Sequence, residues 1–400
     1  MPLSPQPLCR KVTGNSAVTI ASQELRSTRG NDNLESVRVA LLSFNFGQYC
    51  IRLANGLAQE ADVLLLLPSN QAAPYRFGLD PRVQLVELDV PRLRQPLRQS
   101  SMVRAVLMRI RDFDADVVHY QAGHLWFNLI WPFYRSRPVV LTIHETRHHA
   151  GDLISAKTPQ WVMDLGYRRA DRIIVHGEDL RRAVISDLGR PKGIIDTVPP
   201  VPDIVLRETA LDRGKQDDGR TILFFGRIWP YKGLEYLIRA EPLITERVPD
   251  ARIVIAGQGE EFAKYRAMMV NPDHFEIHNE YVSDPDLVRH FSRATVVVLP
   301  HVEASISGVV GVAYTFGKPI VATAVGILPE LVEHRRTGLI VPPRDARALA
   351  EAIVEVLTAD GLAHTLGAAG RDRVETAFDP VSVGRQTLEV YERALVSRRR

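Results

Sequence analysis

The strongest constraint on the fold is a double alternation of short apolar segments with amphipathic helical patterns, interrupted once by polar residues. In the first half, segments rich in aliphatic residues alternate with helical stretches such as 48–59 and 101–111. Such alternation predicts a parallel sheet covered by helices on both faces. We expect strands over 37–43, 62–67, 83–88, 116–120, 138–143 and 172–175.

A proline-rich and polar break follows this first alternation. Residues 197–203 read TVPPVPD and residues 213–220 read RGKQDDGR, which is typical of a linker. A second alternation then begins, with helices expected over 234–247, 308–316 and 346–358. We expect its strands over 221–225, 251–256, 275–278, 295–299, 319–322 and 338–341.

The chain is therefore predicted to be an α/β protein with two doubly wound Rossmann-like domains and a ligand cleft between them. The predicted domains are an N-terminal Rossmann-like domain (37–200) and a C-terminal Rossmann-like domain (221–375), joined by a linker (201–220). Residues 1–36 are expected to be a disordered leader, and residues 376–400 a C-terminal helix with a basic tail.

Composition excludes several classes of protein. Apolar residues make up 45% and charged residues 24%, which argues against general disorder. The net charge of +3 is too small for a nucleic-acid protein that depends on a basic domain. Cys9 and Cys50 cannot form a disulfide framework. Without an apolar signal segment or a spanning stretch of about 20 residues, we expect a cytoplasmic protein.

The segment 224–237, FFGRIWPYKGLEYL, carries the clearest binding pattern. A buried strand ends at Gly226, Arg227 follows, and Lys232 precedes a helix. Glycine admits a ligand close to the backbone, and the two cations with a helix N-terminus suit a diphosphate. Tyr231 stands before the lysine, so this is not a P-loop. The alternative is a turn with two solvated cations.

This segment resembles the donor-phosphate region of retaining glycosyltransferases of GT-B fold, family 4, also called glycosyl transferases group 1. The resemblance continues through IVIAGQGEE (253–261), NEYVSDPDL (279–287), LPHVEASISGVVGVAYTFGKPIVATAVGILPELV (299–332) and TGLIVPPRD (337–345). It implies that Arg227 and Lys232 bind the diphosphate of a nucleotide-sugar donor. It also implies that Gly226 lies beside the donor and that Gly257–Gly259 border the nucleoside pocket. Residues 37–200 would then be the acceptor-side domain and residues 221–375 the nucleotide-sugar-binding domain. Phe262 breaks the dinucleotide fingerprint, so NAD is not expected.

The chain departs from the pattern of many relatives at two positions. Those relatives carry two glutamates eight residues apart, which would fall here on Ala304 and Val312. The sequence instead resembles a subgroup with E-A-S-x-S-G-V, in which Glu303 is the nearest carboxylate and a candidate catalytic residue together with His144, Arg227 and Lys232. Glu330 is a second candidate for contact with the donor.

A serine-rich turn follows Glu303 and opens the next helix. Ser305, Ser307 and the amides of Ser307, Gly308 and Val309 could hold the distal phosphate as its charge develops. The alternative is a serine that caps the helix without binding a ligand.

Histidines gather in the first domain after two predicted strands. We expect His119 and His144 at the edge of the cleft, and the resemblance places His144 opposite the donor sugar. Gly47 lies in the first strand–helix turn, where relatives bring the backbone near donor and acceptor. His176 and His334 are interpreted as structural.

Residues 144–148, HETRH, formally match the zinc-peptidase pattern H-E-x-x-H. That chemistry requires both histidines on one helix face with a third ligand nearby. Because a strand is predicted to run directly into His144, zinc hydrolysis is a weak alternative.

Residues Arg92–Arg111 contain six arginines and no acid, and the latter half is amphipathic. Such a helix could contact an anionic membrane surface at the inner face, or it could pack on the sheet with solvated arginines. The first case would suit a lipid-linked acceptor; a glycan or a small molecule is also possible.

The predicted function is therefore a retaining, metal-independent hexosyl transfer from a nucleoside-diphosphate sugar to an acceptor hydroxyl, in polysaccharide or glycoconjugate biosynthesis. No cofactor and no metal are expected, since Arg227, Lys232 and the Ser307 turn supply positive potential. A non-catalytic glycosyltransferase-like partner and a nucleotide-sugar epimerase are the alternatives. The donor sugar, its base, the acceptor, the linkage and the oligomeric state cannot be read from the sequence.

Overall fold

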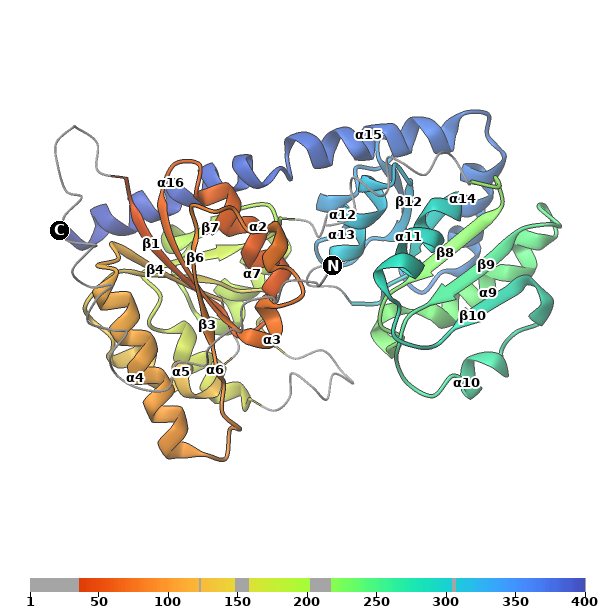
Figure 1. Ribbon diagram of the computed structural model, residues 1–400. Coiled ribbons are helices and arrows are strands. Elements are labelled where there is room, and N and C mark those ends of the chain that lie inside the picture. The colour runs from red at the N-terminus through yellow and green to blue at the C-terminus, as the bar shows by residue number, and fades with distance from the viewer. Residues whose placement is uncertain (1–35, 122–123, 148–157, 202–216, 304–306, 400) are drawn as a thin grey trace, which may run out of the picture.

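The computed structural model describes residues 36–121, 124–147, 158–201, 217–303 and 307–399, and it contains two α/β domains (Figure 1). The N-terminal domain is built on a seven-stranded parallel sheet of order β3-β2-β1-β4-β5-β6-β7. Its strands are β1 Arg38–Leu42, β2 Asp62–Pro68, β3 Gln84–Leu88, β4 Val117–Gln121, β5 Val139–Thr142, β6 Arg172–Val175 and β7 Ile195–Thr197.

Helices cover both faces of this first sheet. They are α2 Gly47–Leu57, α3 Ser69–Ala72, α4 Pro96–Asp112, α5 Leu125–Ile130, α6 Gln160–Tyr167 and α7 Glu178–Leu188. Short 3-10 turns lie at η1 Arg76–Gly78, η2 Trp131–Phe133 and η4 Lys192–Ile194. Alternate residues of the central strands face two separate hydrophobic cores, so the strands are apolar throughout.

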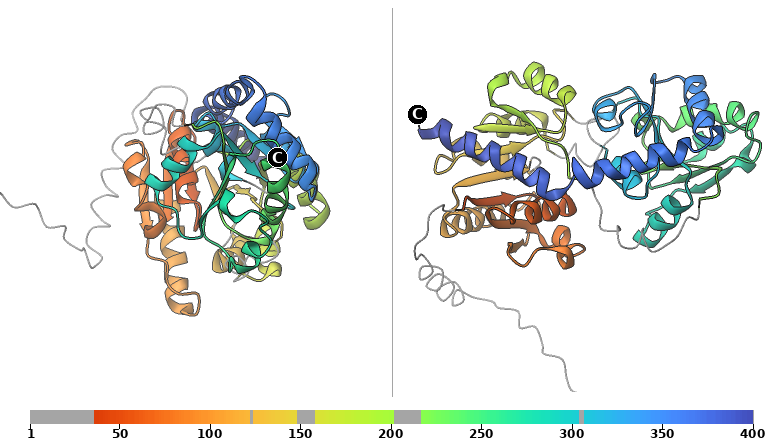
Figure 2. Two further views of the ribbon diagram at one scale, coloured as in Figure 1. Left: turned by 90° about the vertical axis from the view of Figure 1, so that its right-hand side faces the viewer. Right: turned by 90° about the horizontal axis from the view of Figure 1, so that it is seen from above.

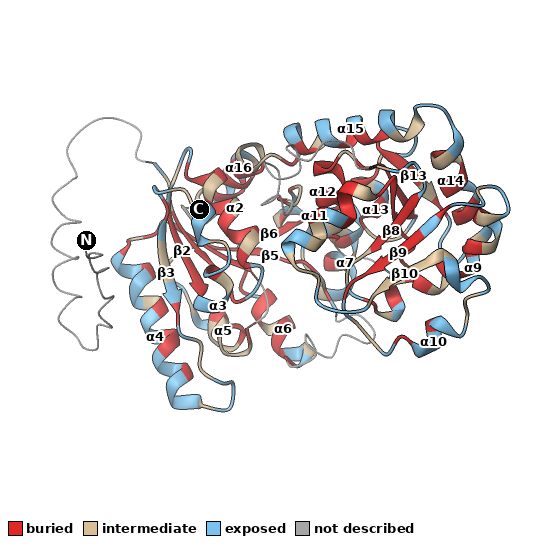
Figure 3. Ribbon diagram, turned by 45° about the vertical axis from the view of Figure 1, so that its right-hand side comes forward, coloured by how far each residue is buried: buried red, intermediate tan, exposed pale blue. Residues whose placement is uncertain are grey.

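The C-terminal domain repeats this architecture with a six-stranded parallel sheet of order β10-β9-β8-β11-β12-β13. Its strands are β8 Thr221–Phe225, β9 Arg252–Ala256, β10 Phe275–His278, β11 Val296–Leu299, β12 Ile320–Thr323 and β13 Gly338–Val341. Burial is concentrated on these strands, apart from the half-buried edge strand β10, and on the inner faces of the helices (Figure 3). The predicted α/β class and its two Rossmann-like domains are confirmed.

The helices of the second domain also lie on both faces of its sheet. They are α9 Leu234–Thr245, α10 Ala263–Arg266, α11 Asp284–Arg293, α12 Gly308–Thr315, α13 Leu328–Leu331, α14 Ala346–Thr358 and α15 Leu362–Thr376. The 3-10 turns η5 Pro230–Lys232 and η6 Pro272–His274 precede α9 and β10.

One strand was not predicted. Strand β7 pairs with β6 through Ile173↔Ile195 and Val175↔Thr197 and forms the edge of the sheet. Its sequence, IDT, has one apolar residue, which is too short a pattern to be recognised as a strand.

The last helix, α16 Pro380–Arg399, leaves the C-terminal domain and packs on the first one (Figure 2). Val383, Leu388 and Tyr391 join the core between α2 and the first sheet. A Cβ added at Gly384 would lie 2.7 Å from the backbone carbon of Gly56, so only glycines allow the two helices to approach this closely. The helix was predicted, but its attachment to the first domain was not.

In the part of the chain that the structure describes, no helix combines the length and the apolar character needed to cross a membrane. The predicted leader, residues 1–36, lies outside the described residues except for Ser36.

Candidate active site

A cavity of about 190 Å³ lies between the two domains and is lined by both. The side chains that line it are mostly apolar, so the few polar groups that reach it stand out. The N-terminal domain contributes Phe46, Tyr49, His144, Pro200 and Val201, and the C-terminal part contributes Ser307, Gly308, Val310, Gly311, Leu331 and Phe378. The predicted cleft therefore exists, and it brings together His144 with Ser307 and Gly308.

His144 is the main polar group on the N-terminal side of the cavity. It follows β5, and its Nε2 lies 2.6 Å from Oε1 of Gln121, so Nε2 carries the proton that it donates to this oxygen. The remaining ring nitrogen, Nδ1, is buried and has no hydrogen-bond partner among the described residues. His144 thus offers an acceptor lone pair at the cavity wall, where a sugar hydroxyl could donate.

Burial lowers the pKa of His144 well below its usual range, and the nearby His176 and His119 lower it further. The imidazole is consequently neutral at physiological pH. It can orient a hydroxyl by hydrogen bonding, but it cannot serve as a preformed cation.

A chain of buried polar groups fixes the orientation of His144. Gln121 Nε2 lies 3.4 Å from His119 Nε2, which also lies 2.7 Å from Thr142 Oγ1. His119 Nδ1 lies 2.7 Å from the hydroxyl of Tyr391 on α16. His119 was expected at the cleft edge, and this prediction is wrong, because its ring lies inside the sheet–helix layer and does not line the cavity.

The first strand–helix turn contributes Phe46 and Tyr49 to the cavity, and not the predicted Gly47. Gly47 is buried, and a Cβ there would lie 2.1 Å from the carbonyl oxygen of Gln71. Its role as a donor contact stays a prediction. Phe46 has a φ of 58°, which is uncommon for an aromatic residue, and its ring packs 4.3 Å from that of His144.

The predicted phosphate segment leaves β8 at Gly226, whose φ is 118°. Arg227 is exposed, and Lys232 is the last residue of the 3-10 turn η5. Burial and the neighbouring Arg227 lower the pKa of Lys232 to about 7. The lysine has no ion pair with a described carboxylate, and its Nζ lies over the Tyr231 ring at 5.0 Å. An anion bound here would restore its charge.

Gly257 and Gly259 hold this segment in place through close backbone contact. A Cβ at Gly257 would lie 1.9 Å from the oxygen of Gly226, and one at Gly259 would lie 2.1 Å from that of Ile228. The Ile228 N–H donates to the Gln258 carbonyl at 3.1 Å. The glycines are thus required by the packing of the β8 and β9 loops, whatever they contact in a donor.

The start of α12 faces the same region. Ser307 precedes the helix, and its buried Oγ has no hydrogen-bond partner in the described parts of the chain. Gly308 lines the cavity, and a Cβ on Gly226 would lie 3.7 Å from Val309 Cγ2, so the phosphate segment adjoins this turn. The first N–H groups of a helix lack intrahelical partners, and they can bind an anion.

Glu303 is exposed and lies beside the phosphate segment, because the N–H groups of Val302 and Glu303 reach the carbonyl of Tyr231. Ser305, predicted to contact the donor, lies outside the described residues. Val312, where many relatives have the second glutamate, is a buried apolar residue of α12.

Glu330 binds the opposite domain. Its two carboxylate oxygens accept the N–H of Glu178, each at 2.9 Å, and one accepts that of Asp179 at 3.3 Å. These donors begin α7, whose N-cap residue Gly177 has no capping side chain. The expected contact with the donor stays a prediction, and it requires the carboxylate to leave α7.

The zinc-peptidase alternative is not supported by the residues that are described. His144 and the residues up to Arg147 are not helical, and His144 Nε2 is engaged with Gln121. His148 lies outside the described residues. His334 behaves as expected of a structural residue, since its Nδ1 accepts the N–H of Ile340. His176 Nδ1 bonds to the carbonyl of Val198, but its buried Nε2 has no hydrogen-bond partner among the described residues, so only one of its two nitrogens fits the structural interpretation.

The basic segment 92–111 forms most of α4, and all six of its arginines are exposed. Leu97 of α4 is 87% exposed, and Phe133 of η2 is 81% exposed. A groove of about 690 Å³ between α4 and the segment 130–137 is bordered by Arg104, Arg111 and Arg137. The surface therefore combines exposed apolar groups with positive charge.

Sequence comparisons agree with this architecture. Residues 46–200 match a glycosyl transferase 4-like domain, and residues 219–359 match the family model described as glycosyl transferases group 1. Together these matches cover most of the chain. The first domain therefore belongs to the glycosyl transferase 4-like domains and the second to the glycosyl transferases group 1, and together they have the two-domain GT-B fold.

Individual relatives show the same class. An uncharacterized glycosyltransferase of Methanocaldococcus jannaschii is 32% identical over 46% of this chain and 47% of its own length. A D-inositol 3-phosphate glycosyltransferase of Nocardioides is 27% identical over 70% of this chain and 67% of its own length. The chain thus spans from about half to two thirds of the length of these relatives.

Among solved structures, HepE of Anabaena in complex with UDP-glucose has a TM-score of 0.68 and 16% identity. The match covers 89% of this chain and all of that one. At this identity the likeness concerns the fold alone.

The sequence did not predict the apolar walls of the cavity. Pro200 and Val201 lie in the segment taken for the boundary of the linker, and Phe378 lies between two helices. Gln121 was also missed. Its position directly after the strand 116–120 was an available signal, since the carboxyl ends of parallel strands form the ligand-binding edge.

Proposed function

We propose that the protein transfers a sugar from a nucleoside diphosphate to an acceptor hydroxyl, with retention of the anomeric configuration. One observation carries the proposal: His144 Nδ1 and Ser307 Oγ, both buried and without partners among the described residues, line one cavity from opposite domains. A sugar between them would satisfy both atoms, which otherwise each cost about 1–3 kcal/mol.

In this proposal the diphosphate lies against Gly226, Arg227 and Lys232 and the start of α12. Two cations and the free N–H groups of Gly308 and Val309 stabilise the charge that develops as the diphosphate departs. Departure on the face from which the acceptor attacks retains the configuration. Glu303 lies beside this segment, within reach of the donor's polar groups. The positive groups replace a metal ion, so no metal is needed for transfer.

Closure of the two domains over the donor would exclude water, which otherwise hydrolyses the sugar nucleotide. The two apolar rings of Phe46 and Tyr49 serve this purpose at the cavity wall. HepE, a structure of the same fold, was solved with UDP-glucose, which supports a nucleotide-sugar donor for this chain.

The exposed arginines and apolar residues of α4 support an acceptor that is presented at an anionic membrane surface. We infer a lipid-linked acceptor in polysaccharide or glycoconjugate biosynthesis. This part of the proposal rests on α4 alone and is independent of the donor site.

The test is a thermal-shift and turnover screen with UDP, GDP, ADP and their sugars, with and without EDTA. A nucleotide at about 100 times its dissociation constant should stabilise the protein by about 2.7 kcal/mol. Arg227→Ala and Lys232→Ala should abolish the shift, whereas Arg239→Ala and Lys192→Ala, at exposed positions on α9 and η4, should preserve it.

The outcomes separate the alternatives. Binding with release of nucleoside diphosphate supports a transferase, and binding without any turnover favours a non-catalytic partner. Conversion of one sugar nucleotide into its epimer would reveal an epimerase. No shift with any nucleotide would refute the donor site.

A further inference from the structure

Three metal-ligating side chains meet at the outer edge of the C-terminal sheet, and the proposed sugar transfer does not use them. Glu276 and His278 alternate along the edge strand β10, so their side chains lie on one face of the sheet. His290 is a buried residue of α11 that faces this strand. One ligand atom of each residue lies within 4.8 Å of those of the others.

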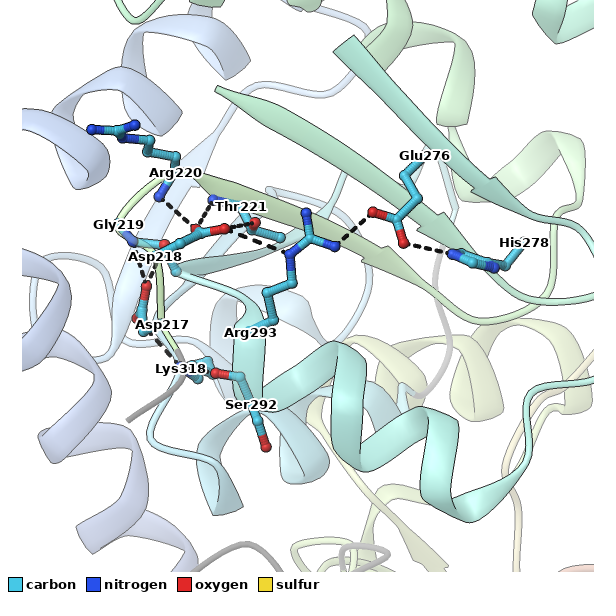
Figure 4. A network of polar contacts seen from close by, with 11 residues as sticks. Asp217, Asp218, Gly219, Arg220, Thr221, Glu276, His278, Ser292, Arg293 and Lys318 are labelled. Atoms are coloured by element: carbon cyan, nitrogen blue, oxygen red, sulfur yellow. Dashed lines mark hydrogen bonds and ion pairs between the residues drawn. The ribbon is translucent and has the colours of Figure 1, made fainter. Parts of the chain in front are cut away.

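The carboxylate and one imidazole are already oriented toward each other. His278 Nε2 lies 2.8 Å from Glu276 Oε1, while Glu276 Oε2 accepts from Arg293 Nη1 at 2.6 Å (Figure 4). The rings of His278 and His290 have centroids 4.7 Å apart. Arg293 thus fixes one carboxylate oxygen and leaves the other directed at the histidine pair, as partners outside a metal's ligands do.

We propose that Glu276, His278 and His290 form a binding site for a divalent transition metal, with Zn²⁺ as the best fit. Two imidazoles and a carboxylate match the ligand preference of zinc, whereas Mg²⁺ and Ca²⁺ prefer oxygen ligands throughout. Zinc bonds of about 2.0–2.2 Å place ligand atoms roughly 3.3 Å apart. Ligand atoms that are now as much as 4.8 Å apart would therefore approach by up to about 1.5 Å. Glu276 Oε1 and His278 Nε2, now 2.8 Å apart, would separate slightly.

Charge at the site is compatible with this assignment. His290 is a buried histidine of α11, and imidazole binds a metal in its neutral form. Asp286 lies one helical turn before His290, and its carboxylate, held by Ser283 and Arg289, adds negative charge on the same side of α11.

The location of the site indicates that a bound metal would stabilise the edge of the C-terminal sheet. Strand β10 is an edge strand with a neighbour on one side only, and a metal would tie it to α11. The carbonyl of His278 accepts the N–H of Gly257 at 2.9 Å, so this stabilisation would reach the loop that packs against the phosphate segment. The site stands independently of the proposed sugar transfer, which needs no metal.

The experiment uses the full chain, stripped with EDTA and dialysed, and titrated calorimetrically with ZnCl₂, with MgCl₂ and CaCl₂ as comparisons. We expect one Zn²⁺ per chain and no binding of the other two ions. Loading with Co²⁺ should produce visible absorption bands typical of a site with nitrogen and oxygen ligands.

Variants locate the site. His278→Gln and Glu276→Gln replace partly exposed side chains, and each should weaken Zn²⁺ binding at least about 100-fold, since even loss of an outer partner costs 10–100-fold. His364→Gln, at an exposed position on α15, and His148→Gln, in the peptidase-like motif, should leave binding unchanged. Nucleotide binding by all variants would show that they fold.

Two results would overturn the proposal. The first is absence of stoichiometric Zn²⁺ binding by the wild-type chain, which would leave Glu276 as a partner of His278 and Arg293 only. The second is Zn²⁺ binding that persists in both His278→Gln and Glu276→Gln, which would place the metal elsewhere.

Discussion

The hydroxyl of Tyr391 lies 2.7 Å from Nδ1 of His119, although 272 residues separate them in sequence. Through His119 and Gln121, this contact connects the last helix of the chain to His144 in the cavity wall. The orientation of a candidate active-site residue thus depends on a helix at the other end of the chain.

Tyr391→Phe should destabilise the protein by about 1–3 kcal/mol, because it leaves a buried histidine nitrogen without a partner. Urea unfolding monitored by circular dichroism measures the change. Tyr281→Phe, at a residue that is 79% exposed, is the matched control and should be neutral. Equal stability of the two variants would mean that the Tyr391 hydrogen bond contributes nothing net.

His144→Asn should lower kcat/KM for transfer by about 10²-fold, the typical effect of losing one positioned polar group in an active site. The affinity for the free nucleoside diphosphate should not change, because in the proposed arrangement His144 contacts the sugar and not the diphosphate. Gln121→Leu should reduce kcat as well. Without Gln121 Oε1, no acceptor among the described residues keeps the proton of His144 on Nε2 and leaves Nδ1 free to accept a hydrogen bond. His364→Asn serves as control, and a loss of nucleotide affinity in His144→Asn would contradict the assignment.

Because the pKa of His144 lies well below its usual range, the ring stays neutral as the pH falls from 8 to 6. The profile of kcat/KM against pH should therefore show no inflection near pH 6.5, where an ordinary histidine titrates. An inflection there that disappears in His144→Asn would show that the residue acts as a charged group.

Lys232 should take up a proton when a nucleoside diphosphate binds. With its pKa at about 7, the side chain is about nine-tenths neutral at pH 8, and two phosphates favour the charged form. Calorimetric titration at pH 8 in buffers of different ionisation enthalpy should reveal an uptake approaching one proton. Lys232→Arg, which is always charged, should bind without uptake, and an equal uptake in both proteins would refute this linkage.

The same shift affects stability in the absence of ligand. The folded-state pKa of Lys232 lies below the ordinary value of 10.5, so the unfolded chain binds more protons between pH 7 and 10.5. This residue alone therefore makes stability rise with pH across that window, and Lys232→Met should remove the contribution. Unfolding free energies of both proteins at pH 7 and 9 provide the comparison.

Glu330→Ala should cost about 0.5–2 kcal/mol, the usual effect of removing a helix N-cap, and should loosen the contact between the domains. Differential scanning calorimetry measures the first effect, and small-angle scattering measures the second. Glu355→Ala, on the surface of α14, is the control. If Glu330→Ala instead weakens nucleotide binding without changing stability, the carboxylate contacts the donor and not α7.

The α4 surface should bind anionic vesicles. Arg94→Gln combined with Arg98→Gln, on either side of the exposed Leu97, should weaken binding about 30-fold, at about 1 kcal/mol per arginine. Arg247→Gln combined with Arg266→Gln, on exposed positions of the other domain, should not. Sedimentation with vesicles of phosphatidylcholine and phosphatidylglycerol tests this, and equal losses in both double variants would deny α4 a special role.

The two α/β domains were largely predictable, because strands that are buried on both faces appear in the sequence as continuous apolar runs such as TILFF and RIVIA. Such patterns predict where strands and helices form, but they do not predict which part of the fold a separate helix packs against. The sequence predicts α16 as a helix, yet its attachment to α2 depends on Gly56 and Gly384, which come into contact only in the folded chain.

Local motifs single out Gly226, Lys232 and Ser307 in the sequence. The structure places Ser307 at the cavity, and the contact of all three residues with a donor stays a prediction. The position of a residue was not predictable where it depends on residues distant in sequence. His119 and His144 both follow apolar strands, but His119 lies within β4 and its ring contacts α16, whereas His144 lies beyond β5 and reaches the cavity. Glu330 lies in a segment, GILPE, that resembles a donor-contacting motif of the family. In the structure, however, its carboxylate accepts hydrogen bonds from the N–H groups at the start of α7.

The path of α16 has a consequence for dissecting the molecule. Because the chain returns to the first sheet after completing the second, the C-terminal domain is topologically an insertion within the N-terminal one. A fragment that stops near residue 200 would lack Val383, Leu388 and Tyr391 and would expose the apolar face of α2. To be isolated, the first domain must keep its terminal helix, with a short designed loop replacing everything between Val201 and Pro380.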